Sequence, residues 1–412
     1  MTQPSTRSET LQLLQGGQAL FPALIQAFDA AASWVQLETY IFDFHGTGAA
    51  VAESLVRAAR RGVTVQVLVD AVGTGPLPAE WQQKFSSSGV QWCAYSPVGS
   101  GLGFLVPERW RRLHRKLCVV DERIVFCGGI NVLDDFYDPN HGDLQAPRFD
   151  FAVALTGPLA AEATDAMALL WWRVQAGYSA RQRHLNEAWE KFKAAGYGGR
   201  TDAKRIAQPG DSGFASLAGG QRPRAALVLH DNLRNRHSIE RAYRKAIGQA
   251  RQEVIIANAY FLPGGKLRRA LVKAARRGVR VTLLLQGKYE YFMQYHAARP
   301  VYGALLAAGV EIHEYSTSFL HAKVAVVDGH WATVGSSNLD PLSLLLAREA
   351  NMVIEDRAFA GELGALLREA IAHHGMRIDP AVYSQRPLGR RIQGWMAYAL
   401  MRLALLLTGQ RY

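Results

Sequence analysis

The amino-acid sequence has 412 residues, a length that favours two domains over a single compact core. Hydrophobic residues make up 49% of the chain and charged residues 20%, which excludes an intrinsically disordered protein. With 47 Lys and Arg against 35 Asp and Glu, the formal net charge is +12, and this sign favours a polyanionic partner. The charge alone does not choose between a nucleic acid and an anionic membrane surface.

The sequence gives no sign of a secretory signal peptide or a transmembrane helix. The N-terminus lacks a basic leader followed by an apolar run, and no segment reaches the ~20 apolar residues that a membrane-spanning helix needs. The most apolar segment, 395–407, is interrupted by Arg402, so we expect it to lie on a membrane or on the protein. The three cysteines, Cys93, Cys118 and Cys127, lack metal-ligand spacing and are expected to be reduced core thiols.

The first elements along the chain read as strand, helix and strand. The apolar run 37–42 (LETYIF) precedes an amphipathic stretch that stops at Gly62 and a Val-rich run to residue 69. The order recurs at 257–262 (ANAYFL) and 271–285 (LVKAARRGVRVTLLL), and a further strand follows in each half. This alternation predicts an α/β layered domain, and its recurrence predicts that the chain is an internal duplication.

Two segments interrupt the repeat. The first half carries extra residues, approximately 97–110 (PVGSGLGFLVPERW), which are interpreted either as a surface loop or as a lid at a lipid entrance. Residues 197–224, where Gly, Ser, Pro and Arg replace the apolar pattern, are the predicted linker between the halves.

One motif occurs in both halves with identical spacing: His, one residue, Lys, four residues, Asp, and then a Gly-led turn that ends in Asn. It covers 114–131 (HRKLCVVDERIVFCGGIN) and 321–338 (HAKVAVVDGHWATVGSSN), with equivalent positions 321 − 114 = 207 residues apart. We expect two hairpins, in which His and Lys project from one strand face. The Asn amide can donate to a phosphate oxygen.

These motifs give the candidate site residues. The predicted catalytic residues are His114, Lys116, Asp121, His321, Lys323 and Asp328, and the predicted phosphate-binding residues are Asn131 and Asn338. Asp121 and Asp328 are interpreted either as turn-forming residues or as groups that tune the neighbouring cation. Asp150 and Glu349 follow the hairpins in short strand-like runs and are candidates for orienting the imidazoles.

A two-fold arrangement of the halves would bring both hairpins to one site and suit phosphodiester cleavage. One neutral imidazole would attack phosphorus, and the other would protonate the leaving oxygen. The Lys and Asn pairs would stabilise the charge on the phosphate oxygens. Because no metal-ligand spacing appears, we expect no metal and no other cofactor.

The paired motifs resemble the HxKx4D signature of the phospholipase D superfamily, and the resemblance covers about 15–368. It implies an internally duplicated phospholipase D-like fold, with two similar α/β sandwich halves and the active site at their interface. Further stretches, above all 330–354 (HWATVGSSNLDPLSLLLAREANMVI), resemble bacterial cardiolipin synthases of the B type, which lacks N-terminal transmembrane helices. The expected boundaries are 10–196 and 225–380 for the halves, and 381–412 for an amphipathic C-terminal tail.

The resemblance implies transfer of a phosphatidyl group from one phospholipid to the alcohol of another, giving cardiolipin. The expected partners are an anionic phospholipid surface, phosphatidylglycerol, and a second phospholipid or alcohol acceptor. The expected location is peripheral, on the cytoplasmic side of the bacterial inner membrane. Carried over by position, His114 is the preferred nucleophile and His321 the general acid and base.

Three alternatives stay open from the sequence. The same motifs serve phospholipase D-type hydrolases and nucleic-acid phosphodiesterases, although only the net charge favours a nucleic acid. The apolar segments 97–110 and 395–407 argue against it. A non-catalytic binding protein is the third, and two complete motifs argue against it.

Overall fold

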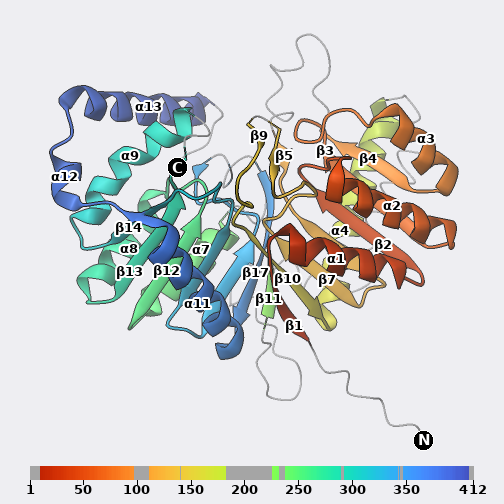
Figure 1. The fold of residues 1–412 in the computed structure, drawn as a ribbon, viewed down its shortest axis with the longest axis horizontal. Coiled ribbons are helices and arrows are strands. Elements are labelled where there is room, and N and C mark those ends of the chain that lie inside the picture. The colour runs from red at the N-terminus through yellow and green to blue at the C-terminus, as the bar shows by residue number, and fades with distance from the viewer. Residues whose placement is uncertain are drawn as a thin grey trace, which may run out of the picture.

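The computed structural model describes residues 10–96, 111–139, 141–181, 225–231, 237–288, 292–341, 343 and 347–407. Within these residues the chain forms two sheet-based halves that lie next to each other (Figure 1). The segment 97–110 and the linker 197–224 lie outside the described residues, so the domain boundaries and the lid interpretation stay predictions.

The first half is built on a seven-stranded sheet in the order β1-β10-β7-β6-β2-β3-β4. Its strands are β1 (Leu11–Gln15), β2 (Trp34–Thr39), β3 (Thr64–Asp70), β4 (Gln91–Tyr95), β6 (Leu117–Val120), β7 (Ile124–Gly128) and β10 (Phe151–Thr156). Its helices are α1 (Gly16–Asp29), α2 (Gly46–Arg60), α3 (Ala79–Ser88) and α4 (Pro158–Arg181). Three two-residue strands lie near the interface: β5 (Arg112–Leu113), β8 (Tyr137–Asp138) and β9 (Gly142–Asp143).

The second half repeats this sheet in the order β11-β17-β16-β15-β12-β13-β14, with β18 added at one edge. Its strands are β11 (Ala225–His230), β12 (Glu253–Asn258), β13 (Arg280–Gln286), β14 (Glu311–Tyr315), β15 (Lys323–Val327), β16 (Trp331–Gly335), β17 (Ala347–Glu355) and β18 (Gly375–Arg377). Its helices are α7 (Ser238–Gln249), α8 (Gly265–Arg276), α9 (Phe292–Leu306), α11 (Arg357–His374), α12 (Pro380–Ser384) and α13 (Leu388–Leu407). The matching order confirms the predicted duplication.

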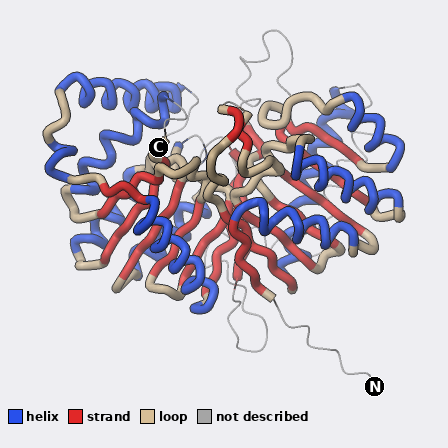
Figure 2. The backbone as a smooth tube through the Cα atoms, viewed as in Figure 1, coloured by secondary structure: helices blue, strands red, loops and turns tan. Residues whose placement is uncertain are grey.

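Each sheet is enclosed by helices, which Figure 2 shows in blue around the red strands. In the first half α1, α2 and α3 cover one face and α4 lies on the other, and in the second half α7, α8 and α9 oppose α11. This layering agrees with strands that are buried on both faces, such as β3 and β13. The α/β sandwich architecture is therefore confirmed for both halves.

The two halves share one hydrophobic core. A single cluster of buried residues includes Val119 and Val153 of the first sheet together with Val324 and Val334 of the second. Strand β5 of the first half also pairs in parallel with β17 of the second. These contacts fix the relative orientation of the halves.

No helix among the described residues is long and apolar enough to cross a membrane. The C-terminal tail instead forms the short helix α12 and the helix α13, which packs against α9.

Candidate active site

Each motif histidine lies at the boundary between the two halves. The backbone N–H of His114 donates to the carbonyl of Arg348 at 3.0 Å, and that of His321 donates to the carbonyl of Phe149 at 3.0 Å. Arg348 and Phe149 directly precede the two candidate carboxylates in sequence. Each histidine segment is thus attached to the other half, next to the other half's acid.

The carboxylates orient the imidazoles in a crossed arrangement. Nδ1 of His114 lies 3.0 Å from both carboxylate oxygens of Glu349, which belongs to the second half. Nδ1 of His321 lies 2.7 Å from Oδ2 of Asp150, which belongs to the first half. Both pairs leave Nε2 as the ring nitrogen that can react, so the predicted orienting residues are brought to the imidazoles by the docking of the halves.

The Asp150 carboxylate is held by its own strand and by a glycine. Its Oδ1 accepts a hydrogen bond from the Phe151 backbone N–H at 2.8 Å. A Cβ placed on Gly129 would lie 2.4 Å from that same oxygen, so only glycine fits beside the acid. Burial raises the pKa of Asp150 to about 7, against the lowering effect of the Lys323 charge.

Two serines that the sequence analysis did not select hold Glu349. The hydroxyl groups of Ser336 and Ser343 both donate to its carboxylate oxygens. Burial alone would raise the pKa of Glu349, but the interactions with His114 and Lys116 and the Ser336 hydroxyl leave it below its ordinary value. Ser336 stands inside the motif copy 321–338, which is the sequence signal that could have found it.

Tyr40 is a further residue that the analysis of the motifs missed. Its ring centroid lies 5.1 Å from that of His114, and the Lys116 ammonium lies 5.4 Å from the Tyr40 ring. Tyr40 directly follows β2, in the segment LETYIF that marks the first strand of the repeat. An aromatic face here contacts both a candidate nucleophile and a candidate phosphate-binding cation.

Both motif lysines are buried beside their histidines. Nζ of Lys116 donates to the His114 carbonyl at 3.0 Å, and Nζ of Lys323 donates to the His321 carbonyl. Burial lowers the pKa of Lys116 to about 7, assisted by the positive charge of Lys323 and opposed by Glu349. Because the two ammonium groups repel each other, the site favours the binding of an anion between them.

The two motif asparagines differ in their present partners. Oδ1 of Asn131 accepts from the Ile41 backbone N–H at 3.2 Å, so its amide NH₂ is the group that can donate to a phosphate. The buried side-chain oxygen of Asn338 has no hydrogen-bond partner within the described part of the chain. This oxygen is an acceptor that a ligand hydroxyl can satisfy, whereas a phosphate oxygen would need the NH₂ group of the same amide.

Asp121 and Asp328 build turns and do not face the imidazoles. Asp121 accepts hydrogen bonds from the backbone N–H groups of residues 32–34, and Asp328 from those of residues 251–253. Both have positive φ, 52° and 50°, as the first central residue of a hairpin turn requires. Seven residues of extended chain, about 20 Å, separate each from its histidine. These contacts favour the turn-forming interpretation of Asp121 and Asp328, and their grouping with the catalytic residues stays a prediction.

The electrostatics of the site favour the neutral form of both imidazoles. Burial lowers the pKa of His114, Glu349 counteracts the shift, and the two lysines add to it. Burial and the charges of Lys323 and Lys116 hold the pKa of His321 well below its ordinary value. Neutral imidazoles are the form that a nitrogen nucleophile needs. No group of three or more His, Cys, Asp or Glu in the described ranges is placed to hold a metal ion.

The chain matches the family described as "Cardiolipin synthase, PLD-like domain" over residues 24–142 and 243–370, one stretch in each half. It is also 36% identical over 396 residues to Cardiolipin synthase B of Escherichia coli strain K12, covering 95% of this chain and 87% of the relative. The chain belongs to this family. The protein is therefore an enzyme of the phospholipase D superfamily, of the phospholipid phosphatidyltransferase type.

Other relatives agree with this membership. Cardiolipin synthase of Geobacillus kaustophilus is 28% identical over 394 residues, covering 94% of this chain and 71% of the relative. Among solved structures, phosphatidylserine synthase of Haemophilus influenzae superposes with a TM-score of 0.67 at 13% identity, covering 97% of this chain and 94% of that one. At this identity the superposition supports the fold alone, and the fold is the predicted phospholipase D-like one.

Proposed function

We propose that the protein makes cardiolipin by transferring a phosphatidyl group from one phosphatidylglycerol to the hydroxyl of a second. The observation that carries the proposal is the crossed pair of carboxylate-held histidines, 2.7 and 3.0 Å, in a chain of the cardiolipin synthase family. The assigned site residues are His114, Lys116, Asn131, Asp150, His321, Lys323, Asn338 and Glu349. A second phospholipid or another alcohol is the proposed alternative acceptor.

The first chemical step forms a phosphohistidine. Nε2 of one imidazole attacks phosphorus, and the bond from phosphorus to the glycerol oxygen breaks. The other imidazole, protonated when the anionic diester is bound, gives its proton to that oxygen and glycerol leaves. The acids Glu349 and Asp150 support the positive charge that develops on the ring each one holds. His114 remains the preferred nucleophile.

The second step releases the product. The same general acid, now acting as a base, takes the proton of the acceptor hydroxyl, and the acceptor oxygen attacks phosphorus as the phosphorus–nitrogen bond breaks. The lysine ammonium groups and the asparagine amides stabilise the equatorial oxygens in both steps. The proposed reaction therefore needs no metal, and its rate should be unchanged by a chelator such as EDTA.

We place the enzyme at an anionic phospholipid surface, peripherally on the cytoplasmic side of the bacterial inner membrane. Support comes from the net charge of +12 and from the phospholipid substrates of the family. A nucleic acid is not proposed as a substrate.

The test is incubation of the purified protein with phosphatidylglycerol vesicles and analysis of the products by mass spectrometry. The proposal predicts cardiolipin and glycerol in equal amounts. Phosphatidic acid without cardiolipin would show a hydrolase instead, and turnover of nucleic-acid diesters without lipid turnover would reject the lipid reaction.

A further inference from the structure

Exposed apolar side chains are concentrated at the C-terminal end of the described chain. Ten large hydrophobic residues in the described ranges are exposed, and seven of them lie between residues 376 and 400. Five belong to α13: Leu388, Ile392, Trp395, Met396 and Leu400. Their spacing of three or four residues places them on one face of the helix, at 49–69% exposure. A contiguous apolar stripe of this kind marks an interaction surface.

The opposite face of α13 is already packed on the protein. Gly394 and Ala397 are buried, and the helix lies along α9 (Figure 1). The inner face therefore fixes the orientation of the helix. Apart from Trp395, which also lines the cavity beneath the helix, the exposed residues of the stripe face away from α9, so the partner of the stripe is not the body of the second half.

The charge of the tail identifies the kind of partner. Residues 380–412 contain no Asp or Glu and five arginines: Arg386, Arg390, Arg391, Arg402 and Arg411. An apolar helix face within a purely basic segment is the pattern of helices that lie in the interface of an anionic bilayer. A protein partner buried against the stripe would not require this exclusion of acids.

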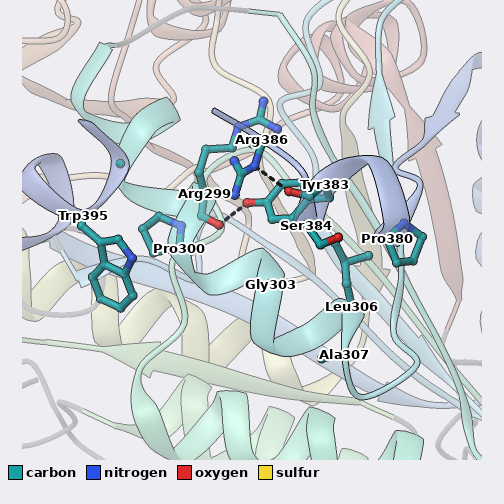
Figure 3. Close-up of a pocket in the computed structure, with 11 residues that line it drawn as sticks. Arg299, Pro300, Gly303, Leu306, Ala307, Pro380, Tyr383, Ser384, Arg386 and Trp395 are labelled. Carbon is teal, nitrogen blue, oxygen red and sulfur yellow. Dashed lines mark hydrogen bonds between the residues drawn. The ribbon is translucent and has the colours of Figure 1, made fainter. Parts of the chain in front are cut away.

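A cavity beneath α13 is lined by basic and aromatic residues and by no acidic ones. It measures about 340 Å³, lies between α9, α12 and α13, and is lined by Arg299, Tyr383, Arg386 and Trp395 among eleven residues that include no acid (Figure 3). The Arg386 guanidinium lies 3.4 Å from the centroid of the Tyr383 ring, and its Nε donates to the Tyr383 carbonyl at 3.0 Å. Arg299 lies on the same wall and pairs with Glu314 at 2.7 Å, so both arginines of the cavity wall also have partners within the protein. Cationic and aromatic walls suit the headgroup phosphate and glycerol of a phospholipid.

We propose that α12 and α13 form the surface by which the enzyme docks on an anionic phospholipid bilayer, with the apolar stripe inserted and a lipid headgroup against Arg386. The choice of a phospholipid membrane rests on the proposed function. In Figure 1, α13 runs along the same upper edge of the molecule as β5, which directly precedes His114. Docking through this edge would turn the side that carries the site toward the membrane that holds its substrate.

The experiment measures sedimentation of the full-length protein with two kinds of vesicle, phosphatidylglycerol mixed with phosphatidylcholine, and phosphatidylcholine alone. Trp395→Ser/Met396→Ser and, separately, Leu388→Ser/Ile392→Ser remove parts of the stripe. Both pairs are solvent-exposed, and thermal unfolding verifies that each variant is folded. The charge control is Lys273→Gln/Arg276→Gln, which removes two exposed cations on α8.

The proposal predicts that wild-type protein prefers the anionic vesicles and that each stripe variant binds them about tenfold more weakly. The α8 control should bind like the wild type. Stripe variants that bind like the wild type, or a control that loses as much binding as they do, would overturn the proposal.

A second measurement separates this proposal from the catalytic one. Turnover of a short-chain phosphatidylglycerol below its micellar concentration needs no membrane, so both stripe variants should retain wild-type rates. If the wild type turned over no phospholipid while the stripe variants still bound vesicles more weakly than the wild type, the docking proposal would be supported and the proposed function would be rejected. Loss of short-chain turnover in the folded stripe variants would place these residues in the reaction and overturn the docking proposal.

Discussion

The two imidazoles are each oriented by an acid that lies far away in sequence. Glu349 is 235 positions from His114, and Asp150 is 171 positions from His321. Because each half supplies the orienting group of the other half's histidine, neither half holds a complete catalytic pair by itself. The reactive geometry is a property of the docked halves.

We expect Asp150→Asn and Glu349→Gln each to lower kcat on short-chain phosphatidylglycerol by about 10²–10⁴-fold. The amide cannot stabilise the imidazolium, and it allows the wrong tautomer. Combining Asp150→Asn with His321→Ala should add little to His321→Ala alone, since both changes disable the same pair. Additive losses, or single variants above half of the wild-type rate, would contradict the crossed assignment.

The pH dependence should report the depressed pKa of Lys116. Its folded-state pKa of about 7 lies below its ordinary value, so the ammonium is present below pH 7 and is lost as pH rises. We expect kcat/KM for the free enzyme to fall about tenfold per pH unit above this pKa. Lys116→Arg, which stays protonated, should shift or abolish this alkaline limb. If the fall of kcat/KM at alkaline pH were unchanged in Lys116→Arg, the titrating group would be a residue other than Lys116.

The hairpins are the elements that carry the motifs, and their aspartates belong to the turns. Each carboxylate satisfies three backbone N–H groups at the start of the strand beside it, β2 or β12. These hydrogen bonds outweigh the effect of burial and hold the pKa of Asp121 and Asp328 below its ordinary value. The Asp of the motif thus attaches the hairpin turn to its neighbouring strand by hydrogen bonds.

For the hairpin we predict that Asp121→Ala lowers the free energy of unfolding by about 1–3 kcal/mol, because N–H groups lose their acceptor and a left-handed residue gains strain. Chemical denaturation measures this change. Asp121→Asn, which tolerates the turn conformation, should lose less. Because the site lies about 20 Å away, kcat of the folded fraction should stay within a few-fold of wild type. A large loss of kcat at unchanged stability would restore Asp121 to the catalytic group.

The small residues after β7 and β16 allow the acids to reach the histidines. Gly129→Ala would place a methyl group 2.4 Å from the Asp150 carboxylate, which must then move away from His321. We predict a kcat loss approaching that of Asp150→Asn, about 10²-fold or more. Gly62→Ala, in open space after α2, is the control that should retain full activity despite its strained φ of 92°. Full activity of Gly129→Ala would show that the acid tolerates displacement.

At the scale of the whole molecule, much of the fold was predictable because a duplication repeats its patterns. The strand, helix and strand units, the stops at Gly62 and Gly278, and both hairpins follow from local periodicity and turn residues. The acids Asp150 and Glu349 could be selected because they occupy equivalent places after the hairpins.

The crossing of the acids could not be predicted, because local patterns carry no information on how two sheets dock. The same holds for Ser343, which contacts Glu349 from outside the strands, and for the packing of α13 on α9. The ambiguity at Asp121 and Asp328 had another cause, since a turn aspartate and a charge-tuning aspartate look alike in sequence. Only the partners of their carboxylates distinguish the two.

The central claim is that one imidazole from each half acts in turn on one phosphodiester. The most direct measurement is acid-quenched mass spectrometry of the protein during turnover of short-chain phosphatidylglycerol, with peptide mapping of the adduct, in wild type and in His114→Ala and His321→Ala. We predict a phosphatidyl adduct on one motif histidine of the wild type, preferentially His114, and loss of steady-state turnover in both variants. Turnover without an adduct, or a variant that retains wild-type rates, would contradict the two-histidine mechanism.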